Sequence, residues 1–350
     1  MIPENNWPTR LLSWFDENHR ELPWRKDHPR NPYQVWVSEI MLQQTRTEAV
    51  KAYFTRWMEQ FPTITALAQA QEADVLRAWQ GLGYYSRARN LHRAAQKVVL
   101  EYDGILPGNS VALRKLPGIG DYTAGAIASL AFGEKIPAVD GNLLRVLARL
   151  YAVKEDVLSS TGKKKITELA EKIIPAERPG SFNEALMDLG AEICIPKAPR
   201  CDMCPLRTQC RAFRENLTQV LPLRKKKAPQ KEFYAAVGIM IQGESFLLYR
   251  RPETGMLASM WEFPMVLSGK SLEEAQAQLE AKLLGKAGEI LWSHKHVFTH
   301  QIWHMTAYRM LGGRPFPGIC AYFTPQQWES FPLAGPHAKL ATFVEQQGIK

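Results

Sequence analysis

Two hydrophobic patterns divide the chain. Over residues 7–213, apolar residues recur at the spacing of amphipathic helices, and short segments rich in glycine and proline interrupt them. After Glu232, β-branched and aromatic residues partly alternate with polar ones in three segments, 233–241, 245–250 and 296–310. These patterns predict a multidomain fold, with an all-α unit followed by an α+β unit.

The stretch between the two patterns is typical of a linker. It contains two prolines and the run Lys225, Lys226 and Lys227. We therefore expect a helical domain over residues 1–216, a linker over residues 217–232 and an α+β domain over residues 233–350. A chain of 350 residues is long enough for these domains.

Composition excludes several classes of protein. A hydrophobic content of 45% with 23% charged residues is typical of a folded chain rather than a disordered one. No apolar run approaches the roughly 18 residues of a membrane span, and the first residues lack the pattern of a secretory signal. We expect a cytoplasmic protein without a membrane partner. The net charge of +9 leaves open both a generic basic surface and a nucleic-acid partner.

Four cysteines give a specific local signal. In a cytosolic chain, clustered cysteines are more often metal ligands than disulfides, and four thiolates suit either zinc or an iron–sulfur cluster. Zinc ribbons usually pair two C-x2-C knuckles, whereas this run has one, so a 4Fe-4S cluster is favoured over zinc or structural thiols. Cys320 is expected to be a buried small residue. The run has the pattern C-x6-C-x2-C-x5-C and consists of Cys194, Cys201, Cys204 and Cys210.

The segment 116–125, LPGIGDYTAG, predicts a tight turn that opens onto a helix. Gly118 and Gly120 flank a single residue, and glycines allow a sharp turn with backbone N–H groups facing outward. At a helix N-terminus such groups bind phosphate oxygens. Taken alone, the two glycines are also compatible with a purely structural turn.

These motifs together resemble a known family. The segment 116–125, Asp140 in VDGN and the cysteine run, in that order, resemble the helix–hairpin–helix DNA glycosylases of the endonuclease III superfamily, over about residues 7–213. LPWR (22–25), VSEIMLQQT (37–45), GLGYYSRARNLH (81–92) and the added β-rich domain narrow the resemblance to adenine-DNA glycosylases of the MutY type.

That resemblance implies a reaction and a partner. The family removes adenine mispaired with 8-oxoguanine or guanine from double-stranded DNA, in base excision repair. The resemblance implies a monomeric bacterial-type protein associated with the nucleoid. Two alternatives remain open: a bifunctional glycosylase and lyase acting on oxidised pyrimidines, and a non-catalytic protein that binds damaged DNA.

Breaking an N-glycosidic bond requires a proton donor for the base and an anion near the sugar, a division of labour also found in O-glycosidases. Glu39 is the candidate acid: Asn31 and Pro32 predict a helix start that places it among apolar residues, where desolvation raises the pKa of a carboxyl. A solvent-facing glutamate is the alternative. Asp140 is the candidate anion, with a simple turn residue as its alternative.

Four further residues are candidates for the same site. Tyr122 stands where bifunctional relatives carry a lysine that forms a Schiff base, which favours a monofunctional enzyme; the phenol could bond a catalytic carboxylate or simply pack. Asn142 is a candidate partner that fixes a carboxylate or water. Glu184 could line the pocket or be structural. Arg25 could steady Glu39 or a phosphate.

The resemblance also implies contacts to DNA. Gln44 and Tyr84 match positions that enter the base stack when adenine is extruded, although buried packing is the alternative for Tyr84. Arg87 is expected to contact phosphate, as are the backbone groups around Gly118 and Gly120.

The second domain resembles a Nudix fold. Its segment 269–285 lacks the Arg-Glu and paired acidic residues of the metal-binding pattern of Nudix hydrolases, so pyrophosphate hydrolysis is not expected. Phe298, Thr299 and His300 stand where the family has a loop that reads 8-oxoguanine. The alternative is an ordinary alternating strand through these three residues.

Overall fold

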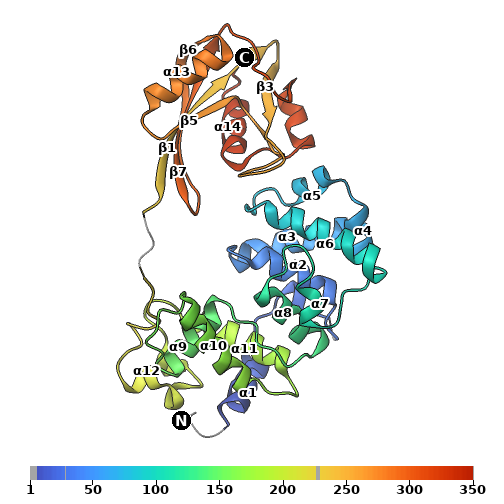
Figure 1. The fold of residues 1–350 in the computed structure, drawn as a ribbon, viewed down its shortest axis with the longest axis vertical. Coiled ribbons are helices and arrows are strands. Elements are labelled where there is room, and N and C mark those ends of the chain that lie inside the picture. Colours follow the sequence, from blue (N-terminus) through green and yellow to red (C-terminus); the bar gives the residue numbers. More distant parts are fainter. Residues whose placement is uncertain (1–5, 28, 226–228, 350) are drawn as a thin grey trace. The chain divides into compact units, whose positions relative to one another are not determined.

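The computed structural model describes residues 6–27, 29–225 and 229–349. The chain forms two compact units, which are Met1–Ala70 with Ser86–Lys226, and Gln71–Tyr85 with Lys227–Lys350. The first unit is helical and the second contains the strands, so the expected fold class is confirmed (Figure 1). In the described part of the chain, no helix is long and apolar enough to cross a membrane.

The helices follow the predicted periodicity. Those of the first unit are α1 (Trp7–Asn18), α2 (Pro32–Leu42), α3 (Thr47–Gln60), α4 (Ile64–Gln69), α6 (Ser86–Tyr102), α7 (Ser110–Leu113), α8 (Asp121–Phe132), α9 (Gly141–Leu150), α10 (Ser160–Ile173), α11 (Pro179–Glu192) and α12 (Arg211–Arg214). Short 3-10 helices lie at Pro23–Arg25, Cys201–Met203 and Arg207–Gln209, and α5 is Glu72–Ala78.

The α11 helix lies at the centre of the first unit. It packs against α1, α8 and α9, and most of its residues are buried. On α9, Leu143 and Leu147 are four residues apart, so they share one face and both enter this core. Because α11 is surrounded in this way, its polar side chains Asn183, Glu184 and Asp188 are held inside the protein.

Strand β1 (Lys231–Ile239) organises the second unit. One sheet has the order β5-β1-β7-β6, with β1 parallel to β7 and the other neighbours antiparallel. A second sheet pairs β3 with β2, β4 and β8. The remaining bounds are β2 (Ile241–Gln242), β3 (Ser245–Arg250), β4 (Trp261–Glu262), β5 (Met265–Ser268), α13 (Leu272–Leu283), β6 (Lys286–Val297), β7 (Gln301–Leu311), β8 (Cys320–Phe323), a 3-10 helix (Pro325–Ser330) and α14 (Gly335–Gln346).

Alternation along β1 builds two cores in the second unit. Ala235 and Val237 belong to the core that contains residues of α14, whereas Ala236 belongs to the core that contains residues of α13. Successive strand residues point to opposite faces of a sheet, so each helix covers its own face. Half-buried Cys320 packs against the α13 core.

The predicted linker, 217–232, is too long at both ends. Leu221 is buried in the first unit, and its carbonyl accepts a 2.9 Å hydrogen bond from Nε of Arg149. The carbonyl of Leu223 accepts from the backbone of Val157. At the other end, β1 already begins at Lys231. Apolar residues within the basic stretch therefore anchor it; Lys226 and Lys227 lie outside the described residues.

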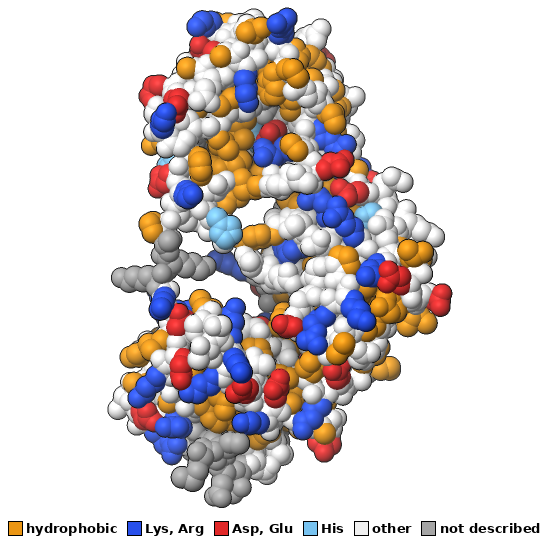
Figure 2. All heavy atoms as spheres, in the orientation of Figure 1, with side chains coloured by type: hydrophobic (Ala, Val, Ile, Leu, Met, Phe, Trp, Pro, Cys, Tyr) orange, Lys and Arg blue, Asp and Glu red, His pale blue; other side chains and the backbone are white. Residues whose placement is uncertain are grey.

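Basic residues do not form a single patch on the face drawn in Figure 2. Lys and Arg side chains are scattered there among acidic ones. Several arginines of the first unit are buried instead, among them Arg25, Arg87, Arg145 and Arg149. The net charge alone therefore does not locate an interface on this face.

Candidate active site

A cleft of about 780 Å³ in the first unit brings the candidate catalytic residues together. They come from α2, α8, α11, the start of α9 and the 3-10 helix Pro23–Arg25, so the site cannot form from one local motif. The residues that line this cleft include Arg25, Glu39, Gln44, Tyr122, Asp140, Asn142 and Glu184.

Glu39 is buried in α2. Asn31 caps this helix by accepting from the backbone of Tyr33 and Gln34, at 2.9 and 3.2 Å, and Pro32 occupies the first turn as predicted. Glu39 is 5% exposed, so the solvent-facing alternative is wrong. Burial raises the pKa of Glu39 to about 7, although a bond from Tyr122 opposes this rise. The carboxyl can therefore hold a proton near neutral pH.

Tyr122 lies in the first turn of α8 and its hydroxyl donates to Oε2 of Glu39. This bond agrees with the expectation that the phenol bonds a carboxylate. Burial raises the pKa of Tyr122 well above its ordinary value, with the Glu39 charge acting in the same direction. The tyrosine therefore stays protonated and acts as a hydrogen-bond donor.

Asp140 caps the N-terminus of α9 and also lines the cleft. Its carboxylate accepts from the backbone N–H of Asn142 and Leu143, at 2.9 and 2.7 Å, and from the Asn142 amide at 2.8 Å. Burial raises the pKa of Asp140, and these bonds oppose the rise. Asn142 thus fixes a carboxylate as expected, and its own oxygen accepts from Arg145 at 2.8 Å.

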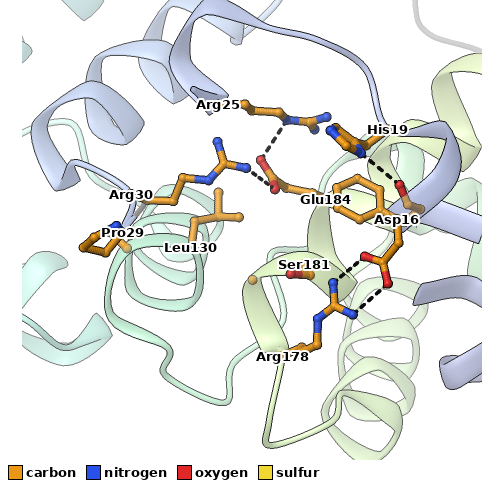
Figure 3. A pocket seen from close by; sticks show the side chains of 12 residues that line it. Asp16, His19, Arg25, Pro29, Arg30, Leu130, Arg178, Ser181 and Glu184 are labelled. Atoms are coloured by element: carbon orange, nitrogen blue, oxygen red, sulfur yellow. Dashed lines mark hydrogen bonds and ion pairs between the residues drawn. The ribbon is translucent and has the colours of Figure 1, made fainter. Parts of the chain in front are cut away.

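The guanidinium of Arg25 forms ion pairs with two carboxylates. Its Nε lies 2.8 Å from Glu184 (Figure 3). Its Nη1 lies 2.6 Å from Asp188. Arg30 binds the other oxygen of Glu184 at 2.8 Å. Because Arg25 is 8% exposed and paired twice, a phosphate contact is ruled out by its position. Its charge still acts on Glu39 and lowers the pKa of that carboxyl.

Glu184 and Arg25 separate two cavities. Both residues line the cleft, and both also line a neighbouring pocket of about 400 Å³ shown in Figure 3. Arg30 lines that second pocket and reaches Glu184 from it. Glu184 is therefore ion-paired and also adjacent to the cleft, so a structural role and a pocket role coexist. Arg30 was not predicted from the sequence, because it lies 154 positions away from its partner Glu184.

The expectation that Arg87 contacts phosphate is wrong. Its Nη1 donates to the carbonyls of Ile40, Met41 and Gln43, at 2.8, 3.0 and 2.6 Å, and its side chain is buried. These carbonyls end α2 and lack partners within the helix, so an arginine donor satisfies them. Arg87 therefore shapes the loop that follows α2.

That loop presents Gln44. Gln44 is exposed and has a φ of 58°, which is uncommon for a residue other than glycine. Tyr84 also has a positive φ, 49°, and is 44% exposed, so its buried alternative is wrong. Backbone strain of this kind often occurs at functional sites.

The two glycines before α8 differ in how strictly the backbone requires glycine. Gly118 has a φ of 77°, and a Cβ there would lie 2.6 Å from Cβ of Asn90. Gly120 has an ordinary φ of −91°, and among the described residues no heavy atom would lie within 4 Å of an added Cβ. Gly120 caps α8 without a side-chain bond, which leaves its first N–H groups open to a partner.

The four cysteines surround one small cavity. Cys194, Cys201, Cys204 and Cys210 all line a space of about 30 Å³, and Nη1 of Arg149 donates to the sulfur of Cys194 at 3.4 Å. In the described residues, no three His, Cys, Asp or Glu side chains are placed to hold a single metal ion. Four cysteine sulfurs around one cavity are a donor set that fits a metal or an iron–sulfur group, and the arginine charge suits thiolates.

In the second unit, residues 298–300 form the turn between β6 and β7. The backbone N–H of Phe298 donates to the carbonyl of Gln301 at 2.9 Å, and Nε2 of Gln230 donates to the carbonyl of Thr299 at 3.2 Å. The alternating-strand interpretation is therefore wrong. Phe298 packs on Trp303, with 4.7 Å between ring centroids, whereas His300 is exposed.

The acidic residues of α13 are engaged with their own unit. Glu274 accepts from Ser268 and Lys270, and Glu280 accepts from Lys286 and the backbone of Ala287. These contacts tie α13 to β5 and to the start of β6.

Two family models match separate parts of the chain. Residues 37–176 match the HhH-GPD superfamily base excision DNA repair protein, and residues 236–342 match the NUDIX domain. A thermostable thymine-DNA glycosylase has a similar structure, with a TM-score of 0.53 and 29% identity over 59% of this chain and 95% of that chain. Endonuclease III from a non-covalent DNA complex gives 0.51 and 26% over 60% and 94%. The fold and site therefore define a helix–hairpin–helix protein of base excision repair.

Curated relatives narrow this class. Adenine DNA glycosylase of Mus musculus is 36% identical, with 92% of this chain and 74% of the relative covered. The protein of that name from Buchnera aphidicola subsp. Acyrthosiphon pisum is 38% identical, with 84% and 83% covered. The Arabidopsis thaliana protein is 41% identical over 76% of this chain and 48% of its own length. The chain belongs to the adenine DNA glycosylase family, which confirms the resemblance drawn from its motifs.

Proposed function

We propose that the protein is a monofunctional DNA glycosylase that excises adenine opposite 8-oxoguanine or guanine in base excision repair. The observation that carries the proposal is Glu39, a buried carboxyl with a pKa of about 7 in the same cleft as the Asp140 carboxylate. Two carboxyl groups with different environments are the arrangement that glycosidic bond cleavage requires.

Glu39 supplies the proton. An adenine extruded from the duplex would enter the cleft, whose volume of about 780 Å³ exceeds that of a purine base. Protonation of a ring nitrogen by Glu39 makes the base a better leaving group. Tyr122 orients the carboxyl through its hydroxyl and keeps a donor beside it after the proton has left.

Asp140 supplies the negative charge. As the C1′–N bond breaks, positive charge develops on the sugar, and a fixed carboxylate stabilises it electrostatically. Three hydrogen bonds hold the Asp140 oxygens, so the group does not need to reorganise during the reaction. Water then attacks C1′ and leaves an abasic site.

The monofunctional assignment rests on Tyr122. A phenol cannot form the Schiff base that strand cleavage by β-elimination requires, whereas an amine can. Lys163 is the one lysine among the described residues that line the cleft, and its side chain is exposed. An exposed lysine is suited to a phosphate rather than to attack on C1′.

Exposed side chains and uncapped backbone N–H groups are the candidates for contacts with DNA. Gln44 and Tyr84 would enter the space left by the extruded base. The open N–H groups at the start of α8, beside Gly118 and Gly120, would receive a phosphate. In the second unit Phe298, Thr299 and His300 would read 8-oxoguanine, because a turn can present both a hydroxyl and an imidazole to a base edge.

The four cysteines would hold a 4Fe-4S cluster, which when bound cross-links the segment after α11 and carries redox chemistry. Arg149 would balance part of the thiolate charge, since it already bonds Cys194. We further propose that the protein acts as a monomer.

The test uses labelled duplexes with adenine opposite 8-oxoguanine, adenine opposite guanine, and an oxidised pyrimidine. We expect adenine release from the first two, with strand cleavage only after alkali. Strand cleavage of the pyrimidine duplex without alkali would favour the bifunctional alternative. Tight binding with no base release from any duplex would favour a damage-binding protein.

A further inference from the structure

Asn183 is a completely buried polar residue next to Glu184 in α11. It is 0% exposed, and its side chain makes three hydrogen bonds within the first unit. Oδ1 accepts from the backbone N–H of Ala138 at 3.1 Å. Nδ2 donates to the carbonyl of Ile136 at 3.0 Å and to Oγ of Ser129 at 2.8 Å.

Two of these partners belong to the segment that carries Asp140. Residues 136–139 lead directly into Asp140, whose backbone N–H donates to the carbonyl of Ala138 at 3.1 Å. Asn183 therefore bonds on both sides of Pro137, like a neighbouring strand, and fixes the backbone immediately before the start of α9. The segment has no regular secondary structure that could do this instead.

Close packing limits where this segment can go. A Cβ on Gly125 of α8 would lie 2.7 Å from the carbonyl oxygen of Pro137, and a Cβ on Gly180 of α11 would lie 2.6 Å from that of Ser129. Because both residues lack a Cβ, the main chain of Gly125 packs directly against that of Pro137, and the main chain of Gly180 packs against that of Ser129. Asn183 supplies the hydrogen bonds inside this contact, where water cannot replace them.

We propose that Asn183 is a positioning residue that sets the place of the Asp140 carboxylate relative to the sugar. The inference rests on the proposed function of Asp140 as the anion near C1′. Asn183 does not reach the substrate; it acts by fixing the segment 136–139. Electrostatic stabilisation depends on a preorganised charge, so a small displacement of Asp140 weakens it in the transition state more than in the ground state.

The experiment compares Asn183→Ala with two control variants. Ser129→Ala removes the bond to α8 but leaves both bonds to the segment. Leu67→Ala truncates a fully buried side chain in α4, away from the cleft, and controls for lost stability. For each protein we measure adenine release in a single turnover, the melting temperature, and affinity for duplexes that carry a cationic pyrrolidine or a neutral tetrahydrofuran in place of the nucleotide.

We expect Asn183→Ala to slow adenine release by at least about tenfold and to lose a similar factor of preference for the cationic analogue over the neutral one. Ser129→Ala and Leu67→Ala should keep that preference, even where they melt earlier. Asn183→Asp, which keeps the acceptor for Ala138 but sets an oxygen against the Ile136 carbonyl, should show the same loss and replaces Asn183→Ala if the latter does not fold.

Unchanged preference in both Asn183 variants would overturn the inference, as would an equal loss in Leu67→Ala. Failure of the proposed function would look different, because the unmodified protein itself would then release no adenine.

Discussion

Glu39 should carry a measurable cost in stability, and Glu39→Gln should remove it. Burial raises the pKa of Glu39 from an ordinary value of 4.5 to about 7. In the unfolded chain the carboxyl ionises freely, whereas in the folded protein ionisation is opposed until the pH approaches 7. The stability associated with the protonated group is therefore fully present below about pH 4.5 and is lost as the pH rises through about 7.

The pKa difference between the unfolded and folded states sets the size of the change in unfolding free energy. Each tenfold change in proton affinity is worth about 1.4 kcal/mol, so the rise of Glu39 corresponds to up to about 3 kcal/mol above neutral pH. A glutamine keeps the shape and an oxygen that accepts from Tyr122, but it has no charge to desolvate. Glu39→Gln should thus equal the unmodified protein near pH 4.5 and exceed it by up to about 3 kcal/mol near pH 8.

The assay is urea unfolding across this pH range, followed by the helical circular dichroism signal, which reports mainly on the first unit. Both proteins carry the same four clustered cysteines, so any effect of pH on the cysteine segment 194–210 changes the unfolding free energy of both proteins alike. Exposed Glu171→Gln controls for the loss of one negative charge. A stability gain that does not vary with pH, or a loss at every pH, would refute the assignment of Glu39 as a buried acid.

The remaining predictions concern catalysis and composition. Glu39→Gln should abolish adenine release with nearly unchanged duplex affinity, and near-normal release by the variant would exclude Glu39 as the acid. The single-turnover rate of the unmodified protein should fall as the pH rises above about 7, because Glu39 then loses its proton. Borohydride should trap little enzyme–DNA adduct; efficient trapping that disappears in Tyr122→Phe would overturn the monofunctional assignment. Purified protein should contain about four irons per chain with acid-labile sulfide, rather than stoichiometric zinc. Thr299→Val should lose roughly 1–3 kcal/mol of preference for 8-oxoguanine over guanine; equal slowing on both substrates argues against Thr299 as the reader.

Local patterns predicted the parts of the site that depend on local structure. The Asn31 and Pro32 signal gave the start of α2 and placed Glu39 among apolar residues, which is enough to predict a raised pKa. The two glycines gave the turn before α8, and with it the place of Tyr122. The order of helices and strands was predictable for the same reason, because periodicity is a property of short segments.

Long-range partners were not predictable in this way. The parallel pairing of β1 with β7 joins residues about seventy positions apart, and periodicity does not specify a partner strand. Arg30 meets Glu184, and Asn183 meets Ala138, only after α11 has packed against the rest of the first unit. A polar residue in an otherwise apolar helix does predict that some hydrogen-bond partner exists, because a buried polar group needs one, but it does not identify that partner.

Arginines show why charge was a weak guide to the interface. A guanidinium carries five N–H donors, so one arginine can satisfy several carbonyls or two carboxylates at once. Arg87 does the first at the end of α2, and Arg25 does the second beside the cleft. Part of the arginine content of the chain therefore lies inside the first unit and is not exposed at its surface. On the function proposed above, we expect phosphate binding to depend on exposed groups, which include the open N–H groups of α8 and Lys163 at the cleft.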